Sequence, residues 1–251
     1  MLINGKQMHI CCTKEDIGRY VILPGDPGRC EKIAKFLDNP EKKAANREFT
    51  VYTGTLLGEK VTICSTGIGG PSTAIAVEEL VECGADTLIR IGTSGGIDPK
   101  VCGGDIVIAT ATVRQEGTSR EYLPIEFPAV SDFTVTSALK KAAEHLHLRH
   151  HIGVIQSKDS FYGEIDPNKM PVADELNQKW KAWRDAGVLT SEMECAALFT
   201  VGLVRKVRCG AVLNVLWNAD NDETPEVTAE SADRGIATAV EAIKILIQED
   251  M

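Results

Sequence analysis

The sequence predicts an α/β sandwich built around a mixed β-sheet. Apolar segments with strand character alternate with segments of helical periodicity, and hairpin segments interrupt this alternation. Glycine-rich turns follow three of the predicted strands, at residues 25–28, 67–70 and 92–96. Because ligands of open α/β sheets collect at the carboxyl ends of strands, we expect a functional site where these turns meet.

Size and charge limit the class of protein. The 251 residues contain no linker, so we expect one domain over residues 1–251. A formal net charge of −9 argues against nucleic acid or an anionic membrane as the main partner, although local arginines can still bind a small anion. No apolar run approaches the roughly 18 residues of a membrane span, and residues 1–9 lack the features of a signal peptide.

The eight cysteines are scattered through apolar segments, and no C-x-x-C pair or Cys/His cluster has zinc spacing. We therefore expect buried free thiols in a cytoplasmic protein, where the reducing environment keeps thiols free.

In the first half of the chain, Asp26 can cap a helix that has Pro27 at its first position. Gly58 and Glu59 predict a hairpin turn, and Gly84 predicts a helix C-terminus. With the apolar patterns, these signals predict strands at residues 19–23, 48–57, 60–65 and 88–91, and helices at 31–37 and 73–83.

In the second half, polar and proline-containing stretches at residues 114–130 and 157–176 predict long irregular segments, and residues 218–226 an acidic loop. Between them, apolar periodicity predicts strands at residues 106–111, 152–156 and 209–217, and helices at 135–146, 180–186, 195–205 and 229–247.

Arg90 lies in the middle of the apolar run Leu88–Ile91. A guanidinium in a strand buried on both faces is costly unless an anion meets it. That anion is either a carboxylate of this chain or a bound ligand such as phosphate, and the run alone leaves both open. Arg29, near the start of a helix that follows the first glycine turn, points to an anion site at the helix N-terminus, the alternative being a solvated arginine.

Glu192-Met193-Glu194 stands between a strand-like pair and an apolar helix. Carboxylates there can accept hydrogen bonds from a vicinal diol such as the ribose 2′ and 3′ hydroxyls. They can also form an acid/base pair of the glycosidase type, or simply cap the helix. A phosphate site beside a ribose site means phosphorolysis of a glycosidic bond. No G-x-G-x-x-G motif of a dinucleotide fold and no P-loop is present.

These motifs together resemble the hexameric nucleoside phosphorylase family, and within it the uridine phosphorylase branch. The resemblance extends from His9 to the C-terminal helix. It rests on seven spaced motifs: Gly25-Asp26-Pro27 with Arg29, Asn46-Arg47-Glu48-Phe49, the run Ser65–Ser72, Arg90-Ile91-Gly92-Thr93, Glu126-Phe127-Pro128-Ala129-Val130, Asp159-Ser160-Phe161-Tyr162 and Glu192-Met193-Glu194.

The resemblance implies a three-layer fold with a partly barrel-like sheet and a set of residue roles. The implied phosphate ligands are Gly25, Arg29, Arg90 and Thr93, joined by Arg47 of a neighbouring subunit. The implied ribose ligands are Met193 and Glu194, with Glu192 beside them and His9 reaching across a dimer interface. The implied wall of the base site comprises Phe161, Ser94, Gly95, Glu164, Leu216 and Trp217. Glu48, Ile68 and Ser72 match positions that hold a monovalent cation, K⁺, between subunits in some members.

The mechanism implied by the resemblance is electrostatic. Inorganic phosphate, the co-substrate, attacks C1′ while the ribose gains oxocarbenium character, and its charge stabilises that cation. Arg90, Glu194 and Asn218 are the expected catalytic residues. No further cofactor is required, and the expected partners are small molecules and other copies of the chain, as a hexamer built as a trimer of dimers with shared sites.

Base recognition departs from the branch pattern. Pyrimidine-specific relatives have a Gln and an Arg shortly after the Phe-Tyr pair, whereas Glu164 stands in this stretch here. Purine-specific relatives have an aspartate where this chain has Asn218, so we expect uridine as substrate. A purine nucleoside phosphorylase, a phosphate-independent nucleosidase and a nucleoside-binding protein remain alternatives. The last two leave the arginines without a role.

Overall fold

The computed structural model describes residues 2–221 and 229–251. The helices are α1 (Gly28–Ala34), α2 (Gly70–Glu82), α3 (Phe133–His145), α4 (Phe161–Ile165), α5 (Ala173–Asp185), α6 (Cys195–Arg205) and α7 (Ala229–Asp250). Two 3₁₀ turns cover Thr118–Glu121 and Pro167–Lys169. The strands are β1 (Leu2–Ile3), β2 (Lys6–Gln7), β3 (Tyr20–Pro24), β4 (Asp38–Asn46), β5 (Phe49–Leu56), β6 (Glu59–Cys64), β7 (Thr87–Gly96), β8 (Ile106–Gln115), β9 (Ala129–Val130), β10 (His150–Lys158), β11 (Thr190–Glu192) and β12 (Arg208–Trp217).

A ten-stranded mixed sheet runs through the molecule in the order β11-β10-β8-β12-β7-β3-β6-β5-β4, with β9 beside β8. The short strand β11 pairs with both β10 and β7, through Ser191 in each case. This double pairing closes β7, β12, β8, β10 and β11 into a five-stranded barrel, from which β3, β6, β5 and β4 extend. The mixed, partly barrel-like sheet expected from the sequence is confirmed.

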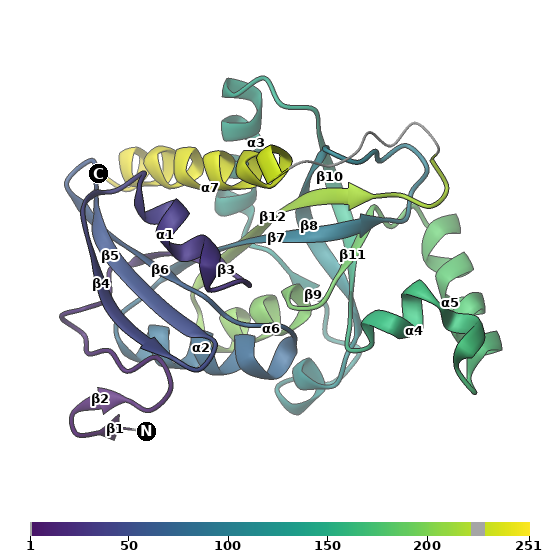
Figure 1. Ribbon diagram of the computed structural model, residues 1–251, viewed down its shortest axis with the longest axis horizontal. Coiled ribbons are helices and arrows are strands. Elements are labelled where there is room, and N and C mark those ends of the chain that lie inside the picture. Colours follow the sequence, from purple (N-terminus) through teal and green to yellow (C-terminus); the bar gives the residue numbers. More distant parts are fainter. Residues whose placement is uncertain (1, 222–228) are drawn as a thin grey trace.

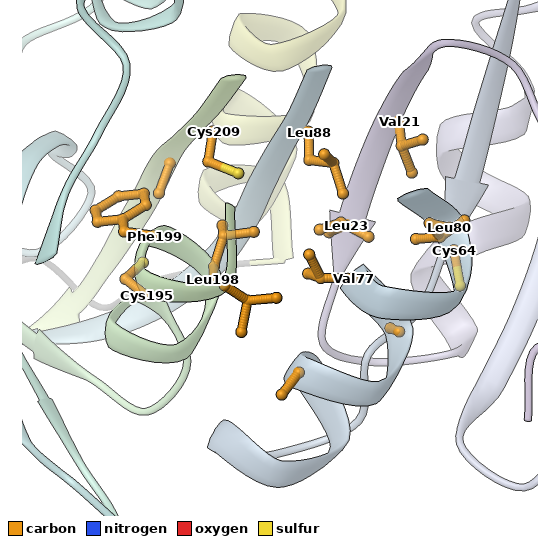
Figure 2. Close-up of a cluster of buried hydrophobic side chains, with 14 of the residues drawn as sticks. Val21, Leu23, Cys64, Val77, Leu80, Leu88, Cys195, Leu198, Phe199 and Cys209 are labelled. Atoms are coloured by element: carbon orange, nitrogen blue, oxygen red, sulfur yellow. The ribbon is translucent and has the colours of Figure 1, made fainter. Parts of the chain in front are cut away.

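Helices cover the two faces of this sheet and make three layers (Figure 1). On one face, α2 and α6 pack over β3, β7 and β12 around an apolar cluster that includes Val77, Leu80, Leu88 and Leu198 (Figure 2). On the other face, α1, α3 and α7 enclose a second cluster. Burial of both faces explains why the central strands are continuous apolar runs.

Several element bounds differ from the sequence expectation, each for a local reason. Helix α1 begins at Gly28, three residues before the predicted start at residue 31, and its N-cap is Pro27 instead of the predicted Asp26, whose carboxylate accepts from the Gly28 amide (2.8 Å). Strand β7 continues through the glycines to Gly96, because β12 pairs with it as far as Gly95 and β11 pairs with Gly96. Residues 157–176, predicted irregular, contain α4 and the start of α5. Strand β4 was not predicted, because its sequence has no strand-like pattern, and it forms by pairing with β5.

All eight cysteines are free, and all except Cys11 are buried, as expected. Burial raises the pKa of the Cys12 thiol to about 12 and that of Cys30 to about 11, so both remain protonated. Within the described ranges, no helix is long and apolar enough to cross a membrane. Most of the acidic loop predicted at 218–226 lies outside the described residues.

Candidate active site

A cavity of about 720 Å³ opens at the carboxyl ends of β3 and β7. The three glycine turns meet there, since the Gly67 amide donates to the Gly25 carbonyl (3.0 Å) and Gly92 lies on the adjoining strand. The cavity is lined by Gly25, Asp26, Pro27, Arg29, Glu48, Gly67, Ile68, Arg90, Gly92, Thr93, Ser94, Gly95, Lys158, Phe161, Glu164, Ile165, Ser191, Glu192, Met193, Glu194, Leu216 and Trp217.

Arg90 is buried and meets two carboxylates at the base of this cavity. Its Nε donates to Glu192 Oε2 (3.1 Å), and its Nη2 donates to Glu194 Oε2. Gly92 makes room for the guanidinium, because a Cβ at that position would lie 2.7 Å from Arg90 Nη2. The internal ion pair, one of the two partners left open by the sequence, is therefore present.

One nitrogen of Arg90 is left over. Among the described residues, no hydrogen bond reaches the buried Nη1. It faces the first glycine turn, where a Cβ on Gly25 would lie 3.8 Å from it. A buried guanidinium N–H without a partner is costly, so this atom marks a place for an anion that enters the cavity.

The pKa values of the two carboxylates beside Arg90 are shifted in opposite directions. Burial raises the pKa of Glu192, but the Arg90 charge and hydrogen bonds from Ser157 and two backbone amides lower it by more, so its pKa lies below the ordinary value. For Glu194, burial together with the Glu192 charge outweighs Arg90, so its pKa is raised. The pKa of Arg90 is raised, because the two carboxylates outweigh the effect of burial.

Glu192 is fully engaged inside the chain. It accepts from the amides of Glu194 (2.8 Å) and Cys195 (3.0 Å), at the start of α6, and from the Ser157 hydroxyl. The helix-capping role that the sequence left open therefore describes Glu192. Glu194 differs, because only the Gly69 amide (2.7 Å) and Arg90 reach its two oxygens among the described residues. Each oxygen retains a lone pair that can accept from a ligand hydroxyl.

At its far end, the cavity contains a cation that was not predicted from the sequence, Lys158, paired with the predicted Glu164. Lys158 ends β10 and donates to Glu164 Oε1 (2.7 Å) and to the Ser191 hydroxyl (2.5 Å). Its ammonium lies 5.9 Å from the centre of the Phe161 ring. The signal was present, because Lys158 ends an apolar strand just as Arg90 interrupts one, and it directly precedes the motif at 159–162.

Aromatic side chains wall the same end. Trp217 lies against Gly95, where a Cβ would come within 3.3 Å of the indole ring. Phe161, half exposed at the start of α4, stands edge-on to Tyr162. The arrangement offers a flat slot with one cation–carboxylate pair, which suits a planar polar ring.

Comparison with known proteins agrees with this geometry. Residues 19–249 match the family model described as the phosphorylase superfamily. The chain belongs to this superfamily. It is 54% identical to a uridine phosphorylase of Treponema pallidum, over 97% of this chain and 95% of that protein. It is 43% identical to a uridine phosphorylase of Thermococcus kodakarensis (98% and 89%), and 38% identical to a guanosine phosphorylase of Halorubrum lacusprofundi (96% and 99%).

Three of the residues predicted to bind substrate or to be catalytic lie outside the cavity lining, as does Ser72 of the predicted cation site. His9 and Arg47 belong to this group, and Arg47 is exposed. Asn218, expected to be catalytic, is the third. Its amide donates to the carbonyls of Asp98 (2.9 Å) and Val101 (2.8 Å), so it joins the segment after β12 to the loop that follows β7.

The predicted cation ligands gather around one turn. Glu48 packs on Gly67, and Ser72 Oγ lies 3.4 Å from where a Gly67 Cβ would be. The Ser72 hydroxyl donates to the Ile68 carbonyl (3.2 Å). The described residues contain no cluster of three or more His, Cys, Asp or Glu side chains able to hold a metal ion. A carboxylate, a hydroxyl and a carbonyl oxygen are hard ligands that would suit K⁺ if a second copy supplied the rest of its shell.

Proposed function

We propose that this protein is a uridine phosphorylase, a pentosyltransferase that converts uridine and phosphate reversibly into uracil and ribose 1-phosphate. The observation that carries the proposal is the unpartnered Nη1 of Arg90, which faces Gly25 and stands next to the carboxylate of Glu194. An anion and a sugar diol bound there would be side by side. The similarity to two proteins named uridine phosphorylase supports uridine as the nucleoside.

Phosphate binds at the first glycine turn in this proposal. Arg90 Nη1 and Arg29 supply positive charge, the Gly25 amide and the Thr93 hydroxyl supply further donors, and Arg47 enters from a second copy of the chain. Arg29 forms no ion pair among the described residues and lines the cavity, so its charge is free to meet the anion. Two guanidiniums with turn amides match the geometry and charge of phosphate.

Ribose lies over Met193, with its 2′ and 3′ hydroxyls donating to Glu194 and its 5′ hydroxyl near His9 of a second copy. Phosphate attacks C1′ from below as the glycosidic bond lengthens. The bond to phosphate forms while the C–N bond breaks, and the electron pair of that bond leaves with uracil. Phosphate charge stabilises the developing oxocarbenium ion. Glu192 holds Arg90 in place throughout.

Uracil occupies the slot between Phe161 and Trp217. Lys158 then takes the part of the arginine that the branch pattern has after the Phe-Tyr pair and that this chain lacks after Tyr162, because an ammonium there can donate to a uracil carbonyl and stabilise the departing anion. Its ion pair with Glu164 leaves that carboxylate partly neutralised and able to accept from the N3–H group. Ser94 and Leu216 complete the wall.

The remaining parts of the proposal concern assembly. Arg47 and His9 have a role only if subunits share sites, which supports a homo-oligomer, here a hexamer built as a trimer of dimers. K⁺ bound by Glu48, Ile68 and Ser72 would stabilise the subunit contact, and removal of K⁺ should weaken assembly without altering the chemistry.

The test is release of uracil from uridine with and without inorganic phosphate. We expect release that depends on phosphate and yields ribose 1-phosphate. Release that ignores phosphate would indicate a nucleosidase, and binding without release would indicate a nucleoside-binding protein. The base preference is tested by kcat/KM for uridine against inosine and guanosine, where a large purine preference would contradict the assignment of uridine.

A further inference from the structure

His9 is held against helix α2 by one buried carboxylate. Glu79 accepts from the backbone amides of His9 (2.9 Å) and Ile10 (2.8 Å), and its Oε1 lies 2.7 Å from the His9 ring nitrogen Nδ1. Because the two backbone amides can only donate, Glu79 acts as an acceptor throughout. It therefore holds the segment and the ring of His9 together.

These contacts fix the direction in which the ring faces. With Nδ1 donating to Glu79, the opposite nitrogen Nε2 is the one left for a ligand. No hydrogen bond to Nε2 is present among residues 2–221 and 229–251. About a quarter of the His9 side chain (23%) is exposed, so Nε2 is accessible from outside the subunit.

The same surface includes Arg47. The side-chain amide of Asn46 donates to the His9 carbonyl (2.8 Å), which ties the His9 segment to the end of β4. Arg47 is the next residue, in the turn before β5, where it adopts a left-handed backbone conformation (φ 52°). The His9 ring also stands edge-on to Phe49, with 6.2 Å between ring centroids. His9 and Arg47 are thus parts of one small surface.

His9 lies too far from its own cavity to reach a ribose there. Helix α2 begins beside Glu194, because the amide of Gly69 donates to that carboxylate. Glu79 comes nine residues after Gly70, which corresponds to about 13 Å along the helix axis. A ribose held by Glu194 does not span that distance, and His9 does not line the cavity.

We propose that Glu79 and Asn46 are positioning residues for the shared site of the proposed function, because they hold His9 and Arg47 as one surface, which in that proposal faces the substrate of a second copy. Glu79 sets the direction of His9 toward the 5′ hydroxyl of a nucleoside in that site. Asn46 couples the same segment to the Arg47 turn. This inference rests on the proposed function, because it takes a nucleoside and phosphate as the ligands.

The test compares uridine with 5′-deoxyuridine, which lacks only the 5′ hydroxyl. In Glu79→Gln, we expect kcat/KM for uridine to fall about tenfold, the effect of one charge-assisted hydrogen bond. For 5′-deoxyuridine we expect a change below about twofold, since His9 has no hydroxyl to meet. Both substrates are measured on one preparation, so a partly unfolded sample leaves their ratio unchanged.

The matched control is Glu78→Gln, because Glu78 is on the same helix but pairs with Arg205 at the surface (2.6 Å). In this control we expect the wild-type ratio of kcat/KM for uridine to kcat/KM for 5′-deoxyuridine. A second variant, His9→Ala, should show the same loss, with Glu79→Gln adding no further loss of uridine selectivity in the double variant. The positioning role would be overturned if Glu79→Gln lowered kcat/KM by the same factor for uridine and for 5′-deoxyuridine, so that the ratio of the two values stayed at that of the wild type. Phosphate-independent release by the wild type would instead contradict the proposed function alone.

Discussion

At the scale of single residues, the site depends on two cations that end or interrupt buried strands. Arg90 is satisfied on two sides by Glu192 and Glu194 and open on the third. Lys158 is satisfied by Glu164 and Ser191. A carboxylate partner within the chain therefore does not exclude a ligand, since a guanidinium has more donors than two carboxylates use.

Arg29 offers the cleanest test of the phosphate site, because Arg90 also supports two buried carboxylates. In Arg29→Ala we expect the KM for phosphate to rise about tenfold or more, with the KM for uridine changed less than about threefold. Lys32→Ala, an exposed cation on the same helix, is the matched control for loss of charge. An unchanged phosphate KM would show that Arg29 does not touch the anion.

The raised pKa of Glu194 predicts how activity depends on pH. Only the ionised carboxylate can accept from both ribose hydroxyls and keep Arg90 in place. Burial raises its pKa above the ordinary 4.5, so kcat/KM for uridine should begin to fall at a pH above 4.5 as the pH is lowered. A profile that stays flat down to pH 4.5 would contradict this role.

Glu194 and Glu192 affect the pH dependence of stability with opposite signs. A carboxyl whose pKa is raised on folding, as in Glu194, favours the folded state below pH 4.5 and loses that contribution as the pH rises through its raised pKa. Glu192, with a lowered pKa, contributes above pH 4.5 and loses its contribution as the pH falls through its lowered pKa. Loss of activity as the pH falls through the raised pKa of Glu194 should therefore not be mistaken for unfolding.

At the scale of elements, helix α3 rests directly on strand β12. Asp132 caps the helix by accepting from the Val135 amide (2.9 Å), and this places Val135 over Gly210. A Cβ on Gly210 would lie 2.4 Å from Val135 Cγ1. The absence of a side chain at Gly210 is thus what lets the layer of α3 and α7 come close to the barrel.

Gly210→Ala should therefore destabilise the protein by about 1–3 kcal/mol, the usual range for an overpacked core. Val135→Ala removes the methyl groups that clash, so Gly210→Ala should cost at least about 1 kcal/mol less in that background. Urea unfolding of the four proteins of the cycle measures this coupling. Strictly additive changes in the free energy of unfolding would show that the clash is relieved elsewhere.

The elements also show how far the sequence could be interpreted. Helix α6 was predicted with its observed bounds, because its apolar run is long and Glu192, just before it, accepts from the amides at its start. Strand β4 was missed, since residues 38–46 are largely polar and exposed and only pairing with β5 makes them a strand. Strand β11 has three residues, too few for any periodic signal.

At the scale of the whole molecule, that short strand closes the barrel. Ser191 pairs with both β10 and β7, and its hydroxyl reaches Glu164 (2.6 Å) and accepts from Lys158. The closure brings Glu194, in the second half of the chain, to Arg90 and Gly69, in the first half. Motif order along the sequence indicated which residues would meet. It did not indicate that Asn218 would donate to the loop that follows β7, because that contact depends on the conformation of the loop at Asp98.

Assembly gives the last prediction, because a shared site can be rebuilt from two defective subunits. A subunit with Arg47→Ala keeps its own Glu194 but cannot supply the arginine to its neighbour's site. A subunit with Glu194→Gln supplies that arginine but has a defective site of its own. We expect little activity from either variant alone. In an isologous dimer, co-expressed and mixed at random, half of the dimers are mixed and one of their two sites is intact.

Mixed preparations should therefore regain about a quarter of wild-type activity, whereas a mixture of two non-sharing subunits would regain none. Purification through two different tags in sequence isolates the mixed dimers, in which about half of wild-type activity is expected because one of the two sites is intact. A mixture of Glu194→Gln with Arg29→Ala is the control, because both changes lie in a subunit's own cavity. Each mixed dimer then has two defective sites, and its activity should stay at the level of the separate variants.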